Sequence, residues 1–275
     1  MFEQLPWRMR IQFALTRGLT RALRALGLRE HVIRGRYSVV RARRRAFERL
    51  GSERYSRPAL HAMDGKLDRI IDLDGGTFVE AGGHDGYTQS NTYYLERFRG
   101  WRGVLVEPMP EMARQARLNR PGSRLFQCAL VGAEQDGDEI EMEFGDLFTK
   151  VRSEGDEDWV RNGLVLGWRD HRVEAVPARS LSSVLAEAGV HQPDLLSLDV
   201  EGYEEQVLGG LDLSRHAPGW ILVEMHDLQA GRAAIGRVLG ASYVEHTQLS
   251  PVDVLYRRSD VTPKPAEGPG AEQRV

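Results

Sequence analysis

The sequence predicts an α/β protein with a mainly parallel sheet covered by helices on both faces, preceded by a basic helical extension. Three observations indicate this architecture. Beyond residue 57, apolar strand-like runs alternate with helical segments, several of these runs end in an acidic residue, and the last two runs flank a short loop. Strands that alternate with helices are typical of a parallel sheet, and a closing pair of strands is typical of an antiparallel hairpin.

Length and composition limit the class of protein. The chain has 275 residues, of which 41% are apolar and 28% charged, as in a globular protein with one large domain and appendages. Cys128 is the only cysteine, which excludes an intramolecular disulfide and a zinc site built on cysteines. No apolar run approaches the roughly 20 residues of a membrane span. Arginines interrupt the core that a signal peptide needs, so we expect a cytoplasmic protein.

Residues 1–57 form the extension, and their charge is opposite to that of the rest. They carry a net charge of about +11, against about −14 for residues 58–275. Apolar residues between Ile11 and Leu26 repeat on one helical face, and a second helix is predicted over Tyr37–Leu50. Such basic helices either bind an anionic membrane surface, here the inner face, or pack on the catalytic domain. No nucleic-acid motif or aromatic interleaving is present, so we expect no nucleic-acid partner.

Residues 58–260 form the main domain, and its elements follow in order after the turn Asp74-Gly75-Gly76. Strands are predicted at Thr77–Ala81, Gly103–Glu107, Arg124–Val131, Ile140–Phe144, Asp194–Val200, Trp220–Met225, Ala241–His246 and Val252–Arg257. Helices are predicted at Ser90–Phe98, Glu111–Leu118, Leu181–Ala188, Glu204–Leu208 and Gly231–Leu239. Residues 145–175 break this alternation and are predicted to be an insertion or lid, and residues 261–275 a disordered tail.

The segment Thr77–Asn91, TFVEAGGHDGYTQSN, is the first candidate for a ligand site. Its pattern indicates a strand, a tight glycine turn and the start of a helix, with Glu80 followed by Gly82, Gly83 and Gly86. Glycines let the backbone pass close to a ligand, which favours a nucleotide-like cofactor. The E-x-G-x-x-x-G spacing is not the G-x-G-x-x-G of dinucleotide binders, which argues against an NAD-dependent oxidoreductase.

Acidic residues end the main strands, and carboxyl ends of parallel strands meet at one sheet edge where ligands bind. Clustered like charge is repulsive there, so stability alone is a poor explanation. These residues are Glu80, Glu107 followed by Pro108, Asp199 with Glu201, and Glu224 with His226 and Asp227 beyond it. Glu107 follows the glycine turn after one helix, and a carboxylate there can accept bonds from both ribose hydroxyls of a nucleoside.

The motifs FVEAGGHDGYTQSNT, GVLVEPMPE, FQCALVG, DLLSLDVEGYEEQVLGGL and ILVEMHD resemble those of FkbM-type S-adenosylmethionine-dependent methyltransferases. The segment SNTYYLERFRGWRGVLVEP is also similar to the related Star-like branch. The resemblance covers about residues 60–257 and implies a class I, Rossmann-like methyltransferase fold with a seven-stranded sheet that ends in an antiparallel hairpin. His84 departs from the family pattern, and its role is left open.

The resemblance also implies roles for the motif residues. Glu80, Gly82, Gly83 and Gly86 would surround the methionine part of S-adenosylmethionine, with Asp85 and Asn91 as secondary candidates. Glu107, beside Pro108, would hold the ribose, and Cys128 and Ala129 would lie beside the adenine. Asp199 would stand at the edge of the methyl-transfer site.

Methyl transfer to a hydroxyl needs alignment with the methyl donor and removal of the hydroxyl proton. The candidate bases are His226, Asp199 and Glu201, with Glu224, His84 and His171 as alternatives; a histidine suits the role because its ordinary pKa is near neutrality. In a second version, not favoured, Asp199, Glu224 and Asp227 hold Mg²⁺.

The resemblance implies O-methylation of a sugar hydroxyl on a glycan, glycolipid or natural product. Aromatic residues in or near the insertion, Phe148, Trp159 and Trp168, could stack on a sugar. The alternative is a non-catalytic, methyltransferase-like binding protein. The sequence carries no signal for the oligomeric state.

Overall fold

The computed structural model describes residues 29–145, 148–151 and 172–262. The chain divides into two compact units, Met1–Tyr55 and Ser56–Val275, and each is described by itself. The helix expected between Ile11 and Leu26, the tail beyond residue 262, and Trp159, Trp168 and His171 of the insertion lie outside the described residues. The described helices include none with the length and apolarity that a membrane crossing requires.

The first unit contains helix α2, Arg29–Arg49. It confirms the helix predicted over Tyr37–Leu50 and begins earlier. The helix ends before Gly51, whose φ of 75° is the left-handed conformation that favours glycine after a helix. Tyr55 folds back onto the last turns, with its ring edge-on to Phe47 at 5.0 Å and beneath the Arg43 guanidinium at 4.4 Å.

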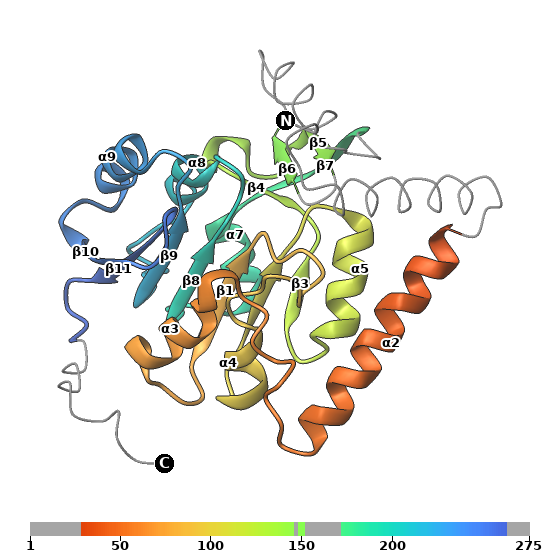
Figure 1. Ribbon diagram of the computed structural model, residues 1–275. Helices are drawn as coiled ribbons and strands as arrows, with labels where there is room; N and C mark the ends of the chain where they lie inside the picture. The colour runs from red at the N-terminus through yellow and green to blue at the C-terminus, as the bar shows by residue number, and fades with distance from the viewer. Residues whose placement is uncertain (1–28, 146–147, 152–171, 263–275) are drawn as a thin grey trace, which may run out of the picture. The chain divides into compact units, whose positions relative to one another are not determined.

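The second unit is built on a seven-stranded sheet with the order β10-β11-β9-β8-β1-β2-β3 (Figure 1). Strands β3, β2, β1, β8 and β9 are parallel, and β11 runs antiparallel to both β9 and β10. The strands are β1 (Thr77–Ala81), β2 (Arg102–Val106), β3 (Arg124–Phe126), β8 (Leu195–Leu198), β9 (Trp220–Glu224), β10 (Tyr243–Gln248) and β11 (Asp253–Arg258). This arrangement confirms the predicted fold, and it places the point where the strand order reverses at β1.

Helices cover both faces of this sheet, and the side-chain alternation of β1 shows which face each residue meets. Val79 belongs to the core cluster that includes α7, α8 and α9, whereas Phe78 belongs to the cluster that includes α3, α4 and α5. The bounds are α3 (Met63–Ile71), α4 (Tyr93–Phe98), α5 (Pro110–Asn119), α7 (Leu181–Ala188), α8 (Glu204–Gly209) and α9 (Leu228–Leu239). Because successive side chains alternate, Glu80 shares the face of Phe78 and points toward α4 and α5.

A second sheet, with the order β4-β7-β5-β6, corrects the prediction. The strand expected over Arg124–Val131 is two strands, because the chain leaves the main sheet at Gln127 and Cys128 and β4 pairs with β7 instead. The strand expected at Ile140–Phe144 belongs to this second sheet, and β7 was not predicted. The bounds are β4 (Ala129–Val131), β5 (Glu139–Gly145), β6 (Phe148–Val151) and β7 (Arg172–Ser180).

Candidate active site

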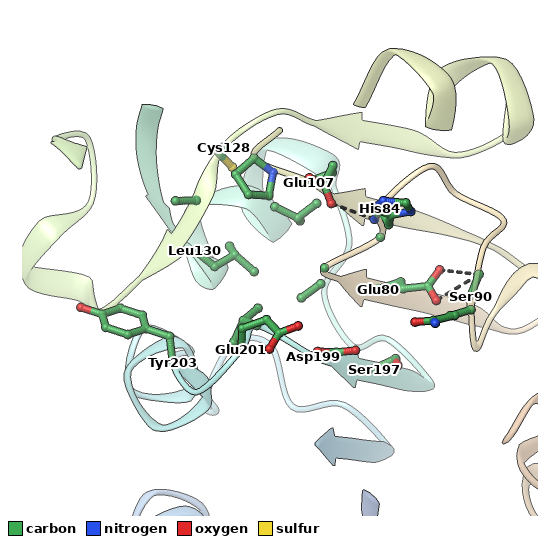
Figure 2. A pocket seen from close by; sticks show the side chains of 18 of the residues that line it. Glu80, His84, Ser90, Glu107, Cys128, Leu130, Ser197, Asp199, Glu201 and Tyr203 are labelled. Atoms are coloured by element: carbon green, nitrogen blue, oxygen red, sulfur yellow. Dashed lines mark hydrogen bonds between the residues drawn. The ribbon is translucent and has the colours of Figure 1, made fainter. Parts of the chain in front are cut away.

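A pocket lies at the carboxyl edge of the main sheet, beside the reversal point at β1 (Figure 2). The second sheet contributes to its wall through Met142 and Val151. Most of the predicted site residues line it: Glu80, Gly82, Gly83, Asn91, Glu107, Pro108, Cys128, Ala129, Asp199 and Glu201. Asp85, Gly86, Glu224, His226 and Asp227 are not among the lining residues.

Gly82 lets strands β1 and β8 approach each other at the floor of the pocket. Its φ is +80°, and a Cβ placed there would lie 1.9 Å from the carbonyl oxygen of Asp199. The amides of Gly82 and Gly83 both donate to the carbonyl oxygen of Val106, each at 3.0 Å. The turn is therefore hydrogen-bonded to β2 and lies directly against the end of β8, and only glycine fits at position 82.

The rest of the turn is a loop and not the start of a helix, which corrects the expectation that Ser90 begins one. Helix α4 begins at Tyr93. The Asp85 carboxylate accepts hydrogen bonds from the amides of Tyr87 (2.9 Å) and Thr88 (2.6 Å), so it shapes the loop from within. Burial opposes the charge of Asp85, but its contact with His84 and these amide bonds leave its pKa lowered.

Glu107 is held in place by backbone amides. One carboxylate oxygen accepts the amide of His84 and the other the amide of Met109, each at 2.8 Å. Burial raises the pKa of Glu107 although these hydrogen bonds oppose the shift. A carboxylate oxygen has two lone pairs, so each oxygen can accept one further bond, which matches the two hydroxyls of a ribose.

His84 lies in the pocket wall beside Glu107, with a φ of 45°. Its Nδ1 is 3.8 Å from Asp85 Oδ1. Burial disfavours the charged imidazole, but the nearby carboxylates of Asp85 and Glu107 outweigh burial and raise the pKa of His84. Among the described residues that line the pocket, His84 is therefore the basic group, and the others are acidic or neutral.

Glu80 lines the pocket, but protein groups surround its carboxylate. It accepts the hydroxyl of Ser90 at 2.9 Å (Figure 2). It also accepts the hydroxyl of Thr92 and the amide of Asn91, each at 2.8 Å. Glu80 is 4% exposed, which leaves little room for a ligand atom. Asn91 is better placed to meet a ligand: its Nδ2 donates to Ser197 Oγ at 3.0 Å across the pocket floor.

Asp199 and Glu201 form an acidic corner with Glu224. Solvent reaches the Asp199 carboxyl group through the pocket although protein atoms enclose it. Burial and the neighbouring charge of Glu224 raise the pKa of Asp199 well above its ordinary value. Burial and Glu224 also raise the pKa of Glu201, to about 7, while His226 opposes that shift.

Glu201 has two further features that distinguish it. Its φ is 54°, a conformation that is unfavourable for a residue with a side chain and is often found at functional sites. Its Oε2 lies 3.4 Å from Nε2 of His226, whose side chain is 58% exposed. His226 therefore reaches the pocket through Glu201.

Asp227, one of the three acids considered as Mg²⁺ ligands, has a structural role. One oxygen of Asp227 accepts the amides of Gln229 and Ala230 and so caps helix α9. Within the described ranges, no group of three or more His, Cys, Asp or Glu residues is arranged to hold a metal ion.

Other residues that line the pocket were not predicted from the sequence. They are Ala81, Thr88, Gln89, Ser90, Val106, Leu130, Met142, Val151, Ser197, Val200 and Tyr203, whereas His84, considered as a base, also lines the pocket. Ser197 had a signal, because it is a polar residue inside the apolar run DLLSLDV. Met142 and Val151 had none, since their position depends on how the second sheet pairs.

Comparison with known proteins gave one family match. Residues 80–249 match the family described as the methyltransferase FkbM domain. A search of curated proteins found no match. Among solved structures, the chain is similar to a TehB-like SAM-dependent methyltransferase from Corynebacterium glutamicum, with 11% identity, a TM-score of 0.41 and coverage of 82% of this chain and 98% of that one. It is also similar to precorrin-6y C5,15-methyltransferase from Geobacter metallireducens, with 11% identity, a TM-score of 0.39 and coverage of 72% and 87%.

Proposed function

This chain belongs to the FkbM family of S-adenosylmethionine-dependent methyltransferases, and we propose that it methylates a hydroxyl oxygen of a glycan, glycolipid or other polyhydroxylated small molecule. The choice of oxygen as the methylated atom rests on the carboxyl group of Glu201. This group lines the same pocket as the Gly82 turn, and its pKa is about 7. A hydroxyl acceptor needs such a base, since its proton must leave as the new bond forms.

The pocket residues fit S-adenosylmethionine. Gly82 lets the backbone of Asp199 lie directly against the turn in the pocket, and the fixed Glu107 carboxylate suits the ribose hydroxyls. Cys128 and Ala129 offer a buried apolar wall for the adenine. When bound, the cofactor supplies an electrophilic methyl group on its sulfonium sulfur.

We assign to Glu201 the role of the general base that removes the proton of the acceptor hydroxyl. Its pKa near 7 makes it partly ionised at neutral pH, which is the condition for an efficient general base. Burial and the charge of Glu224 raise the pKa of Asp199 well above its ordinary value, which favours its protonated form, so we assign Asp199 a hydrogen bond to the acceptor rather than removal of the acceptor's proton. His226 contacts Glu201 and acts as a positioning residue.

The proposal that the acceptor is a polyhydroxylated molecule rests on the polarity of the acidic corner formed by Asp199, Glu201 and Glu224. Carboxyl groups bind sugar hydroxyls well, and Tyr203 adds an aromatic ring to the pocket wall. Of the aromatic residues expected to stack on a sugar, Phe148 begins β6, and the two tryptophans lie outside the described residues.

An acceptor screen tests this proposal. Incubation with S-adenosylmethionine and a panel of sugars and glycolipids should give O-methylated products, identified by mass spectrometry and NMR. Methyl transfer to nitrogen or carbon would contradict the proposed oxygen chemistry. Cofactor binding without turnover on any panel member would favour the non-catalytic alternative.

Replacing Glu107 tests the ribose assignment. Glu107→Ala should weaken S-adenosylmethionine binding by about 1.5–3 kcal/mol, the range for losing hydrogen bonds to a charged group. Isothermal titration measures the Kd. Glu111→Ala, on the partly exposed side of α5, is the control and should leave the Kd unchanged. An unaltered Kd in Glu107→Ala would remove Glu107 from the ribose role.

We also propose that helix α2 brings the protein to an anionic membrane surface, such as the cytoplasmic face of the inner membrane. One stripe of the helix is exposed and combines apolar with basic side chains, including Val39 (69% exposed), Arg43, Arg49 and, just past its end, Leu50 (84%). Apolar insertion and attraction to anionic lipids act together in such a helix.

Charge reversal tests this partner. The full-length double variant Arg43→Glu/Arg49→Glu should lose binding to vesicles that contain phosphatidylglycerol, measured by co-sedimentation. The control Arg102→Glu/Arg117→Glu makes the same charge change at exposed positions of the second unit and should bind like the wild type. Equal binding by both double variants and the wild type would refute the proposal.

A further inference from the structure

Arg120, at the end of α5, is a fully buried arginine behind the cofactor turn. Its side chain is 0% exposed. A buried guanidinium is costly unless its donors are satisfied. Its Nε donates to Glu96 at 2.5 Å, its Nη2 to the Thr92 hydroxyl at 3.0 Å, and its Nη1 to Ser90 Oγ at 3.2 Å.

Arg120 also contacts the turn itself and Glu80. Nη1 lies 3.3 Å from the carbonyl oxygen of Gly86 and 3.5 Å from Oε2 of Glu80. The neighbouring Asn119 donates to the carbonyl oxygen of Asp85 at 2.7 Å. The end of α5 therefore holds the first half of the loop, and Glu80, through Ser90, Asn91 and Thr92, holds the second half.

Half of the named members of this network lie outside the pocket. Glu80, Ser90 and Asn91 line the pocket, whereas Thr92, Glu96 and Arg120 do not. Their side chains are buried or nearly so, between β1, α4 and α5. Thr92, Glu96 and Arg120 can thus affect the cofactor only through the position of the loop.

We propose that Glu80 and Arg120 form a positioning clamp that sets the affinity for S-adenosylmethionine by holding residues 85–92 in their binding conformation. In this role Glu80 is a positioning residue and not a ligand of the cofactor. A loop that is already ordered pays less conformational entropy when it binds, so the clamp increases affinity without touching the ligand.

Thr92→Val tests the clamp at a position away from the cofactor. It keeps the shape of the side chain but removes the donor to Glu80 and the acceptor for Arg120. The Kd for S-adenosylmethionine should rise about tenfold, which corresponds to one lost hydrogen bond to a charged group. Amide hydrogen exchange should become faster in residues 85–92, and added S-adenosylmethionine should restore the protection.

Thr77→Val is the matched control, because Thr77 also donates its hydroxyl to a carboxylate, that of Asp194, at the opposite end of β1. It should lower the Tm and leave the Kd and the exchange of residues 85–92 unchanged. The clamp is overturned if both variants change the Kd equally, which would indicate a general loss of stability.

Glu80→Gln separates the clamp from direct binding. The clamp predicts that Glu80→Gln and Thr92→Val weaken S-adenosylmethionine binding to a similar extent and accelerate exchange in the same residues. A large loss of affinity in Glu80→Gln with a wild-type Kd in Thr92→Val would show that Glu80 is a direct ligand, and would refute the proposal.

Discussion

Gly82→Ala should abolish detectable binding of S-adenosylmethionine and lower the Tm. The new Cβ would lie 1.9 Å from the carbonyl oxygen of Asp199, which is part of the backbone and cannot rotate away. The φ of +80° adds about 1–2 kcal/mol of strain for any residue with a Cβ. Relief requires β1 and β8 to separate at the floor of the pocket, where the cofactor turn and Asp199 meet. Isothermal titration and thermal unfolding measure the two effects.

Gly75→Ala controls for the backbone strain alone. Gly75 has a φ of +70°, but a Cβ there would meet nothing within 4 Å, and it lies before β1, at the end away from the pocket. This variant should lose some stability and keep the wild-type Kd. Normal cofactor binding by Gly82→Ala would mean that the close approach of Asp199 to the turn is dispensable.

The order of strands and helices was predictable because each element has a local signal. The run of β9 is recognised as a strand by its short length, and the helix Leu181–Ala188 by the helical spacing of its apolar residues. The second sheet was not predictable, because β7 is identified by its pairing with β4 and β5, which are far from it in the sequence. The break at Gln127 and Cys128 was not predictable for the same reason, because no local sequence signal shows that the chain passes from one sheet to the other there.

The position of the site could be predicted from one rule about parallel sheets. The contacts of individual side chains could not be predicted, because they depend on partners that are distant in the sequence. Glu107 and Asp199, expected at one edge of the sheet, both line the pocket, since carboxyl ends of parallel strands share an edge. The sequence could not show that Asp85 points into its own loop, or that His226 contacts Glu201 instead of lining the pocket. The partners of Glu80 were hidden for the same reason, because Arg120 approaches it from another helix.

Glu201→Gln should reduce kcat by about 10²–10⁴-fold, the contribution expected of a general base. The Kd for S-adenosylmethionine should stay close to that of the wild type, because the amide keeps the size of the side chain. Steady-state kinetics with an acceptor from the screen measures kcat. Glu205→Gln, which changes a half-exposed acid on α8, should retain wild-type kcat. A fully active Glu201→Gln enzyme would assign the proton to another group.

The pH dependence gives a second and independent readout of Glu201. The base works when ionised, so kcat/KM of the wild type, which reports the groups of the free enzyme, should rise with pH through about 7 and then level off. Stability should change in the opposite direction. Because the folded state binds the Glu201 proton more tightly than the unfolded state, the free energy of unfolding falls as pH rises from about 4.5 to about 7, and Glu201→Gln should remove that part of the slope.

The contact with His226 sharpens this test, since it lowers the pKa of Glu201 against the effects of burial and of Glu224. His226→Ala should therefore move the midpoint of the pH–rate profile above 7 and recover activity at higher pH. A catalytic histidine would behave differently, because its removal would depress kcat at every pH. An unshifted midpoint in His226→Ala, with kcat low throughout, would transfer the role of base from Glu201 to His226.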